Sequence, residues 1–599
     1  MKVYKKILTL LCAGLLGGSL VSCEDFLDRE PFDKIDNSPE FYNSEANLRT
    51  SVNGMYTVVF TGYNSGWSRS RFGNQSGANL LSDDLAQKTP SHFTKVAPAS
   101  GGGWDFSTVK KMNILIEGLE GSTLPDEVKN HWMGVFLFYR ATQNFDLIQA
   151  FGDIPYYETA PTSDNMEELF KAQQDRAVSM KMMLEDLKFA SEHVRKNDGN
   201  PGVEVNKAVV DAMAAKMMLF EGSWQKYHKQ NKEDAKIFFQ AARDFAKKVM
   251  DTGDFAIADN YHDLFISEDL GNNPEMIIYR SYVEGKATHS VMSFDIEQPQ
   301  ENAPSKSLIE SFRSQNGLPI HQAENTQYQG DLTHADEMAN RDPRLYACID
   351  REELHYRPLY SKLSDTGYFS HKFTKPEYID TPAGQSSTNT TDSPVLRYAE
   401  VLLIYAEAVA ELNDLGAQQM TQTDLDKSVN LIRAREGVAL PPLKLSGTDL
   451  TVNGVVINDP DRDADVSPIL WEIRNERRVE LAMEGFRKDD LRRWKKLHYA
   501  DNQDNVKQNM GAYADLDAIL QKLNDQAEAE GKLTEELKEQ NAKSVASMKL
   551  YGGGRKGYIM PASTNLRTVE EKHYLSPLPL DQIKLYQDRG KVLKQNPGW

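Results

Sequence analysis

The amino-acid sequence predicts an α-rich fold, and three observations lead to this prediction. Apolar residues recur at the three- and four-residue spacing of amphipathic helices along most of the chain. The helical stretches follow one another as pairs, and only two short stretches have the composition of strands. Long irregular segments lie between some pairs, whereas no Pro-, Gly- or Ser-rich linker divides the chain. We therefore expect a single body in which helix pairs form a scaffold and long loops project from it.

Helices are expected wherever the apolar periodicity is sustained. They are predicted over residues 45–60, 104–119, 127–150, 167–196, 206–225, 233–251, 395–412, 422–436, 468–496 and 515–545. Ser467 followed by Pro468 is a clear start signal, because serine caps the first N–H groups and proline is tolerated at the first helical position. The predicted strands are 276–279 and 452–457, and the predicted long loops are 61–103, 281–340, 351–393 and 438–466.

The succession of helix pairs predicts a solenoid of tetratricopeptide type. The strict signature of those repeats is absent, so this prediction depends on the order of the elements. The loops are longer than ordinary connections between helices. Loops of such length on a rigid scaffold commonly carry binding residues.

The first residues of the chain have the features of a secretory signal peptide. Lys2, Lys5 and Lys6 precede an apolar run at residues 7–21. This run contains glycines and is shorter than the roughly 20 apolar residues of a membrane-spanning helix. A basic start followed by a short apolar run is typical of a signal that is removed on export.

The cleavage region, Leu20-Val21-Ser22-Cys23, resembles the lipobox of bacterial lipoproteins. The resemblance implies that residues 1–22 are removed and that Cys23 carries the acyl chains that anchor the protein to a membrane. Two or more acyl chains give stable attachment, whereas one chain attaches only marginally. Glu24 and Asp25 resemble the export tag of surface lipoproteins, which implies that the protein faces the cell exterior. An ordinary signal peptide with an incidental cysteine is the alternative interpretation.

The charge and the cysteines exclude several classes of function. The chain has a formal net charge of −19, and removal of residues 1–22 takes away three lysines and no acids, which gives −22. Such an acidic chain is a poor partner for nucleic acid or for anionic lipid. Cys12 leaves with the signal peptide and Cys23 is expected to be acylated, so Cys348 is left alone. We expect no intramolecular disulfide, no cysteine-based zinc site and a buried, inert thiol at Cys348.

Several strings in the chain resemble the motifs of one family. In chain order they are Ser22-Cys23-Glu24-Asp25-Phe26-Leu27, Phe151-Gly152-Asp153-Ile154-Pro155, Arg341-Asp342-Pro343-Arg344-Leu345, residues 396–408, Asn475-Glu476-Arg477-Arg478-Val479-Glu480-Leu481, Glu484-Gly485-Phe486-Arg487, Asp490-Leu491-Arg492-Arg493-Trp494 and Gln595-Asn596-Pro597-Gly598-Trp599. In this order, behind a lipobox, they resemble the SusD/RagB family of nutrient-binding outer-membrane lipoproteins.

The resemblance implies a fold and a function. The fold would be a single SusD-like body over residues 23–599, with an N-terminal helical-repeat part at about 40–260, a loop-rich ligand part at about 261–393 and a C-terminal helical part at about 394–599. The function would be to bind glycans and to deliver them to a SusC-like TonB-dependent outer-membrane transporter, over which the protein acts as a lid. Such capture makes and breaks no bond, so no enzyme activity, cofactor or metal is implied.

Glycan binding needs exposed aromatic faces for sugar rings and planar polar side chains that grip hydroxyl groups at two points. The segment Gly62–Asp84 supplies both kinds of residue, and its candidate ligand residues are Tyr63, Trp67, Arg69, Arg71, Phe72 and Asp83. Trp67 is the leading candidate because helical packing explains it least, although it could instead anchor the loop onto the body. The resemblance implies that the loop at 61–103 and a segment at roughly 281–330 contribute, which adds Tyr282 and Tyr328.

The charged residues of the family-like strings are interpreted as structural. Arg397, Glu400, Glu407, Glu476, Arg477 and Glu480 lie at helical spacings, where opposite charges can pair. Arginines beside these carboxylates would keep them ionised, so we expect no catalytic constellation there. Trp471 and Trp494 lie on helical faces and are expected in the core.

Further kinds of chemistry have less support in the sequence. It has no phosphate-binding glycine loop, no HExxH motif and no GxSxG motif. Asp459, Asp461, Asp463 and Asp465 form an alternating acidic run, which we interpret as a solvated loop, with a calcium site as the alternative. A surface glycosidase would need two carboxylates roughly 5 to 9.5 Å apart across a cleft. The same fold with peptide or another nutrient as its cargo, and a purely structural scaffold, are two more functions that the sequence leaves open.

Overall fold

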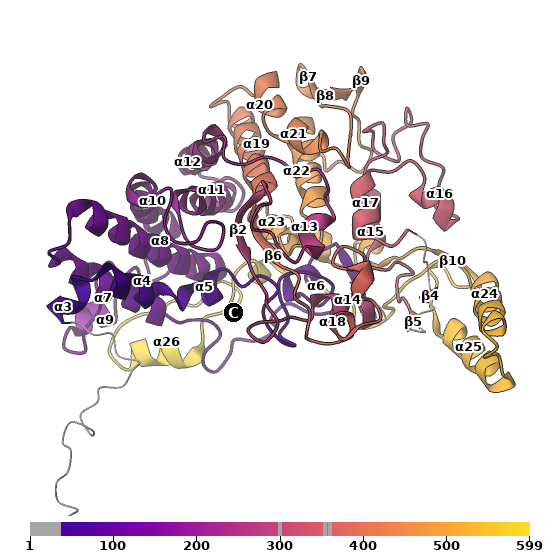
Figure 1. Cartoon of the computed structure of the whole chain (residues 1–599), viewed down its shortest axis with the longest axis horizontal. Helices are drawn as coiled ribbons and strands as arrows, with labels where there is room; N and C mark the ends of the chain where they lie inside the picture. The colour runs from indigo at the N-terminus through magenta and orange to yellow at the C-terminus, as the bar shows by residue number, and fades with distance from the viewer. Residues whose placement is uncertain (1–37, 298–301, 352–355, 358–361) are drawn as a thin grey trace, which may run out of the picture.

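The computed structural model describes residues 38–297, 302–351, 356, 357 and 362–599. The predicted signal peptide, Cys23, Glu24 and Asp25 lie outside the described residues. The described chain is rich in helices and has only short strands, as predicted. Figure 1 shows the N-terminal helices gathered on one side and the loop-rich middle of the chain on the other. In the described part of the chain, none of the helices is both long and apolar enough to span a membrane.

The N-terminal half of the chain contains most of the long helices. In chain order the helices are α3 (Pro39–Tyr42), α4 (Glu45–Val52), α5 (Met55–Val59), α6 (Gly77–Leu80), α7 (Ser107–Glu120), α8 (Asp126–Phe151), α9 (Met166–Leu169), α10 (Arg176–His193), α11 (Lys207–Trp224) and α12 (Lys232–Asp251). They continue as α13 (Asp263–Ile266), α14 (Val291–Glu297), α15 (Lys306–Ser311), α16 (His334–Met338), α17 (Pro343–Cys348), α18 (Pro382–Gln385), α19 (Tyr398–Asp414), α20 (Gln422–Asp426), α21 (Val429–Arg433), α22 (Pro468–Glu480), α23 (Arg487–Arg493), α24 (Leu516–Ala529), α25 (Glu535–Ser547) and α26 (Leu580–Gln587).

The described strands are short and pair in small antiparallel sheets. They are β1 (Leu85–Gln87), β2 (Met276–Arg280), β3 (Asn302–Pro304), β4 (Tyr356–Arg357), β5 (Lys362–Leu363), β6 (Ser393–Arg397), β7 (Lys444–Ser446), β8 (Asp449–Val452), β9 (Val455–Val456), β10 (Tyr513–Asp515) and β11 (Lys556–Tyr558). The predicted strand at 276–279 is β2, and the one at 452–457 falls on β8 and β9 of a three-stranded sheet. The pairing of β1 with β3 joins the two predicted ligand loops, 61–103 and 281–330.

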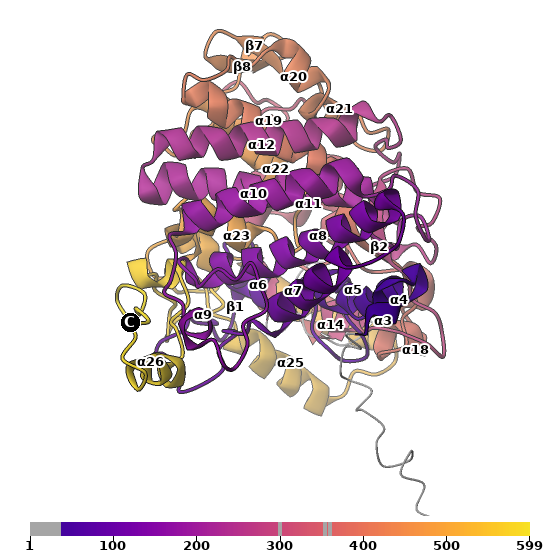
Figure 2. The same ribbon diagram turned by 90° about the vertical axis from the view of Figure 1, so that its left-hand side faces the viewer.

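The helix pairs stack in one continuous series, as the sequence predicts. Helix α7 contacts α8, α8 contacts α10, α10 contacts α11, and α11 contacts α12. The series then continues with α19 and α22, which come from the C-terminal part of the chain. Figure 2 shows α8, α10, α12 and α19 as successive rungs of this stack. The arrangement confirms the prediction of tetratricopeptide-like helix pairs.

Several predicted helices are divided where the backbone leaves the helical region. The stretch at 468–496 ends as α22, because Met483 and Gly485 take positive φ angles of 63° and 84°, and it resumes as α23. The stretch at 515–545 divides into α24 and α25 around Gly531, whose φ is 67°. A left-handed residue cannot continue an α-helix. The stretches at 45–60, 167–196 and 422–436 are also each divided into two helices.

Two helix ends follow the sequence signals closely. The Ser467 hydroxyl accepts a hydrogen bond from the Leu470 N–H, and Pro468 occupies the first turn of α22, as predicted. Helix α8 ends at Phe151, and Gly152 follows with a φ of 79°. A Cβ at Gly152 would be strained by this backbone angle and would lie 3.0 Å from Leu575. The positive φ therefore explains why glycine follows α8 in the string Phe151-Gly152-Asp153-Ile154-Pro155.

The charged residues of the family-like strings form ion pairs in the interior. Arg397 is buried and contacts Glu275, Glu480 and Glu484 at 2.6, 2.9 and 2.7 Å. Arg344, in the Arg-Asp-Pro-Arg string, reaches Glu480 at 3.0 Å. The pairs connect β6, α17 and α22 with Glu275, just before β2, and Glu484, just after α22, so the partners do not lie along one helix face. This placement supports a structural role for these residues.

Cys348 is a free, buried thiol, as predicted. Burial raises the pKa of Cys348 to about 11. A thiol with such a pKa is protonated at neutral pH and is a poor nucleophile.

Candidate functional site

The loop between α5 and α6 presents one tryptophan to solvent. The side chain of Trp67 is 53% exposed. The Trp67 ring meets Phe294 of α14 edge to face, with ring centroids 5.7 Å apart. Arg69, two residues further along the loop, is also exposed. The loop therefore offers an aromatic face and a guanidinium group on one short segment.

Buried aromatic side chains hold this loop in place. Tyr63 and Tyr282 stack with centroids 6.2 Å apart, and Phe72 meets Tyr63 edge to face at 5.0 Å. The Tyr63 hydroxyl donates to the Phe265 carbonyl at 3.1 Å, and the Tyr282 hydroxyl donates to the Asn64 carbonyl at 2.7 Å. These contacts fix both the entry and the exit of the segment that carries Trp67.

The placement of these aromatic residues corrects a prediction from the sequence. Tyr63, Phe72 and Tyr282 were expected to contact ligand, but they are only 1%, 2% and 3% exposed. Side chains with so little exposed surface have no ring face for a sugar. Burial raises the pKa of both tyrosines above its usual range, as expected for phenols in an apolar cluster. The three residues support the loop from within.

Arg71 also has a supporting position. Its guanidinium donates to the Val395 carbonyl at 2.6 Å and lies over the Phe486 ring at 4.6 Å. The contact ties the loop to β6 and to the Glu-Gly-Phe-Arg string. Burial lowers the pKa of Arg71, which is consistent with a side chain enclosed by protein. Of the predicted residues near Trp67, Arg69 alone shares its exposure.

Asp83 and Tyr328 lie in a different place from Trp67. Asp83 is buried and accepts two hydrogen bonds from Arg487, at 2.7 and 2.8 Å. Tyr328 is half-buried, and its ring is 5.8 Å from the ring of His321. Asp83 and His321 both line one cavity, so these two predictions point to a second location.

This second location is a cavity of about 350 Å³ beside α15 and α22. Trp471 and Tyr499 supply aromatic surface to it, and Asn475, Arg478 and Lys507 supply polar groups. Trp471 was expected in the core, but it is half-buried and also lines a smaller adjoining cavity of about 40 Å³. Its indole N–H donates to Asp459 at 2.9 Å. The alternating acidic run, which begins at Asp459, is thus the sequence signal of this cavity.

The acidic run is neutralised by cations of the chain. Asp459 contacts Arg313 at 2.8 Å, Asp461 contacts Lys507 at 3.2 Å, and Asp463 contacts Lys496 at 2.7 Å. A calcium ion favours carboxylates without such competitors. The pairing therefore favours a structural loop over a calcium site.

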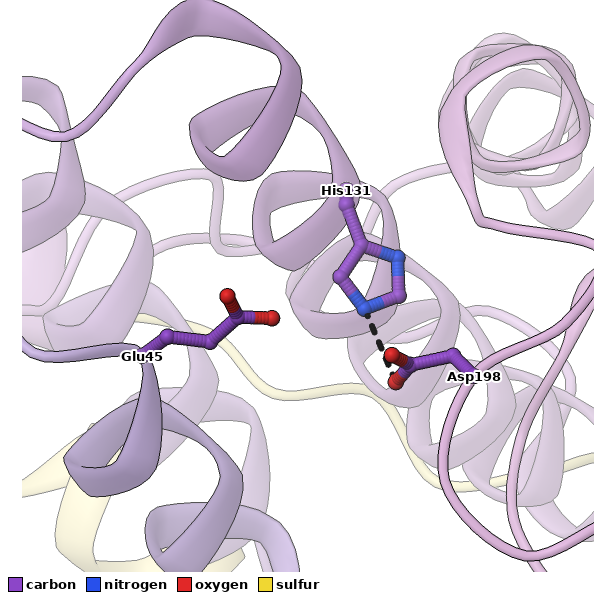
Figure 3. A group of neighbouring side chains, drawn as sticks. All are labelled: Glu45, His131 and Asp198. Atoms are coloured by element: carbon purple, nitrogen blue, oxygen red, sulfur yellow. Dashed lines mark ion pairs between the residues drawn. The ribbon is translucent and has the colours of Figure 1, made fainter.

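Glu45, His131 and Asp198 form another cluster of potential metal ligands (Figure 3). His131 Nδ1 accepts a hydrogen bond from the Arg195 N–H at 3.2 Å. The proton of the neutral ring is therefore on Nε2, which lies 3.3 Å from Asp198. A metal needs an unprotonated nitrogen, so this tautomer opposes coordination.

The two carboxylates of this cluster already have partners. Arg195 contacts Glu45 at 2.5 Å, and Arg49 contacts Asp198 at 2.7 Å. Burial lowers the pKa of His131, which keeps the ring neutral. The cluster joins α4, α8 and the connection after α10 and is best described as a structural contact.

Comparison with known proteins gave two family matches and many structural ones. Residues 287–599 match the model described as SusD family, and residues 25–219 match the one described as starch-binding associating with outer membrane. The comparison with curated proteins gave no match.

Solved structures with a similar fold include three proteins named for carbohydrate binding. A SusD-like carbohydrate-binding protein from Bacteroides fragilis has a TM-score of 0.64 and 20% identity, over 91% of this chain and 99% of that one. Surface glycan-binding protein A from Bacteroides fluxus has a TM-score of 0.56 and 17% identity, over 93% and 100%. A laminarin-binding SusD-like protein has a TM-score of 0.52 and 17% identity, over 93% and 100%. At these identities the likeness shows the shared fold.

Proposed function

Because the chain belongs to the SusD family, we propose that it captures glycans at the outer membrane and delivers them to a TonB-dependent transporter. The second family match, described as starch-binding and associating with the outer membrane, supports the ligand class and the location. The names of the similar structures, which include carbohydrate, glycan and laminarin binding, support the same ligand class.

The observation that carries this proposal is the exposure of Trp67. The exposed indole offers a large apolar face, and a sugar ring has an apolar face that fits it. Phe294 supports the indole from the side, and the buried Tyr63–Tyr282 pair holds the loop. A rigid platform loses little conformational entropy on binding. Arg69 can then grip hydroxyl groups at two points.

The proposal includes an anchor and a partner. The lipid on Cys23 would hold the protein at the outer membrane, facing the exterior, and a SusC-like transporter would take up the bound glycan. Residues 23–599 would act as one body, with its helical-repeat part at about 40–260, its ligand part at about 261–393 and its second helical part at about 394–599. The continuous helix stack from α7 to α22 supports a single body.

Capture without bond cleavage fits the carboxylates of the cavity. A glycosidase needs one carboxylic acid that keeps its proton near neutral pH. Burial would raise the pKa of Glu310, but His321 and nearby lysines outweigh it and lower the pKa to about 2. Burial would likewise raise the pKa of Asp463, but Lys496 and Tyr499 lower it to about 2. These two acids are ionised at neutral pH and are unsuited to protonate a leaving group.

The test is affinity electrophoresis of residues 24–599 through gels that contain one polysaccharide each. The panel includes laminarin, starch, xylan, mannan and a mucin glycan preparation, with casein as the peptide-cargo probe. Trp67→Ala is the test variant. Tyr551→Ala is the matched control, because Tyr551 is another aromatic residue with half of its side chain exposed.

Retardation by one polysaccharide, lost in Trp67→Ala and kept in Tyr551→Ala, is the expected result. Removal of the indole should weaken binding about tenfold or more, because burial of a large apolar side chain contributes on the order of 1.5–3 kcal/mol. Retardation that survives in Trp67→Ala would move the site away from the loop. Retardation by casein alone would replace glycan by peptide cargo.

A further inference from the structure

We propose that the cavity beside α15 and α22 is a second carbohydrate site, which binds a short neutral saccharide. Its volume, about 350 Å³, lies at the lower end of the range of small-molecule pockets, roughly 300–1,000 Å³. The ligand class rests on the proposed function, whereas the site itself rests on the cavity. The Trp67 loop surface is separate, since neither Trp67 nor Arg69 is among the lining residues.

The aromatic wall of the cavity is held in a fixed orientation. The Trp471 indole N–H donates to Asp459 at 2.9 Å, and the Tyr499 hydroxyl donates to Asp463. Each ring therefore has its polar atom engaged at one edge. Its remaining surface toward the cavity is apolar, and such surface suits the face of a sugar ring.

Polar groups that line the cavity have hydrogen-bonding atoms available for the hydroxyl groups of a ligand. Asn475 donates from its side-chain nitrogen to the Ser311 carbonyl at 3.1 Å, which leaves the amide oxygen as an acceptor. Arg478 donates to Ser307 at 3.1 Å and to Asp84 at 2.9 Å, and its guanidinium group has further N–H donors. Hydroxyl groups both donate and accept, so a saccharide matches this mixed lining better than an apolar ligand does.

The charge balance of the lining favours a neutral ligand over an ion. Burial would raise the pKa of Asp83, but Arg478 and Arg487 outweigh it and hold the pKa well below its usual range. Asp459 is paired with Arg313 at 2.8 Å. A charged ligand would have to break such pairs inside the protein, which is unfavourable because it leaves a buried charge unpaired.

The rim of the cavity contains Glu310, His321 and Asp461, whose ligand atoms lie within 4.8 Å of one another. Lys507 occupies this group, at 2.9 Å from Glu310 and 3.2 Å from Asp461. A divalent cation would have to displace the lysine ammonium group. These lysine contacts therefore disfavour a cation site at the rim. His321 at the rim is exposed, so the cavity opens to solvent there.

The test is hydrogen–deuterium exchange of residues 24–599 with laminaribiose, maltose, cellobiose or lactose at millimolar concentration. Calcium chloride alone and the dipeptide Gly-Gly alone are the competing probes. The reporter segments are 459–463 and 499–507, which contribute lining residues to the cavity. His321→Trp is the blocking variant, because it adds bulk at the exposed rim; it also removes the contact of His321 with Glu310 at 3.4 Å, and Glu310 keeps its contacts with Lys306 and Lys507. Gln540→Trp is its control, since it adds the same bulk at an exposed position of α25.

We expect at least one disaccharide to protect both reporter segments in the wild-type chain, in Trp67→Ala and in Gln540→Trp. His321→Trp should weaken this protection at least about tenfold in disaccharide concentration. Trp471→Ala, checked for folding by thermal unfolding, should abolish it. Protection of the two reporter segments without protection of residues 61–71 would contradict a glycan site on the Trp67 loop and support the cavity site.

Three results would overturn the cavity proposal. The first is an absence of protection at 459–463 and 499–507 with every disaccharide. The second is protection by calcium or by Gly-Gly and not by a saccharide, which would make the cavity a cation or peptide site. The third is equal protection in His321→Trp and in the wild-type chain, which would place the saccharide outside the cavity.

Discussion

The Tyr282 hydroxyl donates a hydrogen bond to the Asn64 carbonyl at 2.7 Å, across 218 positions of the sequence. Tyr282 belongs to the loop-rich middle of the chain, and Asn64 lies three residues before Trp67. The bond joins the two predicted ligand loops at the base of the exposed indole. It makes the geometry of the Trp67 surface dependent on a residue that no ligand can touch.

Tyr282→Phe should therefore weaken glycan binding while the fold is kept. The substitution removes one hydrogen bond, which contributes about 1 kcal/mol, and preserves the stacked ring. We expect a binding loss of a few-fold, smaller than that of Trp67→Ala, and faster hydrogen exchange at residues 61–71. Tyr279→Phe is the control, because Tyr279 is a neighbouring, half-buried tyrosine on β2. Unchanged exchange in Tyr282→Phe would show that the stacking contacts alone hold the loop.

Glu480→Ala should strongly destabilise the protein. Burial would raise the pKa of Glu480, but Arg435, Arg397 and Arg344 outweigh it and lower the pKa to about 2. Removal of this carboxylate leaves the positive charge of these buried arginines only partly neutralised. We expect the free energy of unfolding in urea to fall by about 3–5 kcal/mol. Glu436→Ala, at an exposed position, should change it by less than about 0.5 kcal/mol. A small change for Glu480→Ala would mean that the remaining acids, such as Glu275 and Glu484, are enough to compensate the buried arginines.

Buried neutral histidines should make the protein sensitive to mild acid. Burial lowers the pKa of His289 to about 3, and its Nε2 lies 2.8 Å from the Thr391 carbonyl. The unfolded chain binds a proton near pH 6.5, whereas the folded chain does not. The contribution of His289 is thus complete above pH 6.5 and is lost as the pH falls toward 3.

The expected loss from His289 alone is about 2–3 kcal/mol at pH 4.5. Urea unfolding between pH 7.5 and 4.5 measures it. His289→Gln, whose amide can still donate to Thr391, should flatten this slope. His321→Gln is the control, because His321 is exposed. An equal slope in the wild-type chain and in His289→Gln would contradict the prediction.

Cys348 should be inert in the folded protein. Its pKa is raised to about 11 by burial, so the thiolate that reacts with disulfide reagents is scarce at pH 8. We expect no reaction with Ellman's reagent in buffer and stoichiometric reaction in guanidinium chloride. Rapid reaction of the native protein would show that the surrounding cluster opens easily.

The scaffold was predictable from sequence because its signals are local. The periodicity at 206–225 and 233–251 matches α11 and α12, and Ser467 caps α22 as its position before Pro468 indicates. The divisions within the longer stretches were not predicted. Met483, for example, takes a positive φ that nothing in its residue type requires.

The candidate site was predictable only by segment. Composition drew attention to Gly62–Asp84, but it could not separate Trp67, which is exposed, from Tyr63, which is buried. Tyr63 is covered in part by Tyr282 and Phe373, which are distant in the sequence. Asp83 shows the same limit, because its arginine partner, Arg487, is 404 positions distant. Trp471 was assigned to the core since its helical spacing does not reveal the cavity beside it.

The contact between α12 and α19 has an evolutionary consequence. These helices pack side by side in the stack, although residues 252–397 separate them in the chain. The segment 252–397, which contains the second of the two predicted ligand loops, therefore lies between two helices that pack together whatever this segment contains. Doubling the length of such a loop costs only about 0.6 kcal/mol in closure entropy. Proteins that share this helical scaffold can therefore change their ligand by insertions and deletions between α12 and α19, while the packing of the helices is kept.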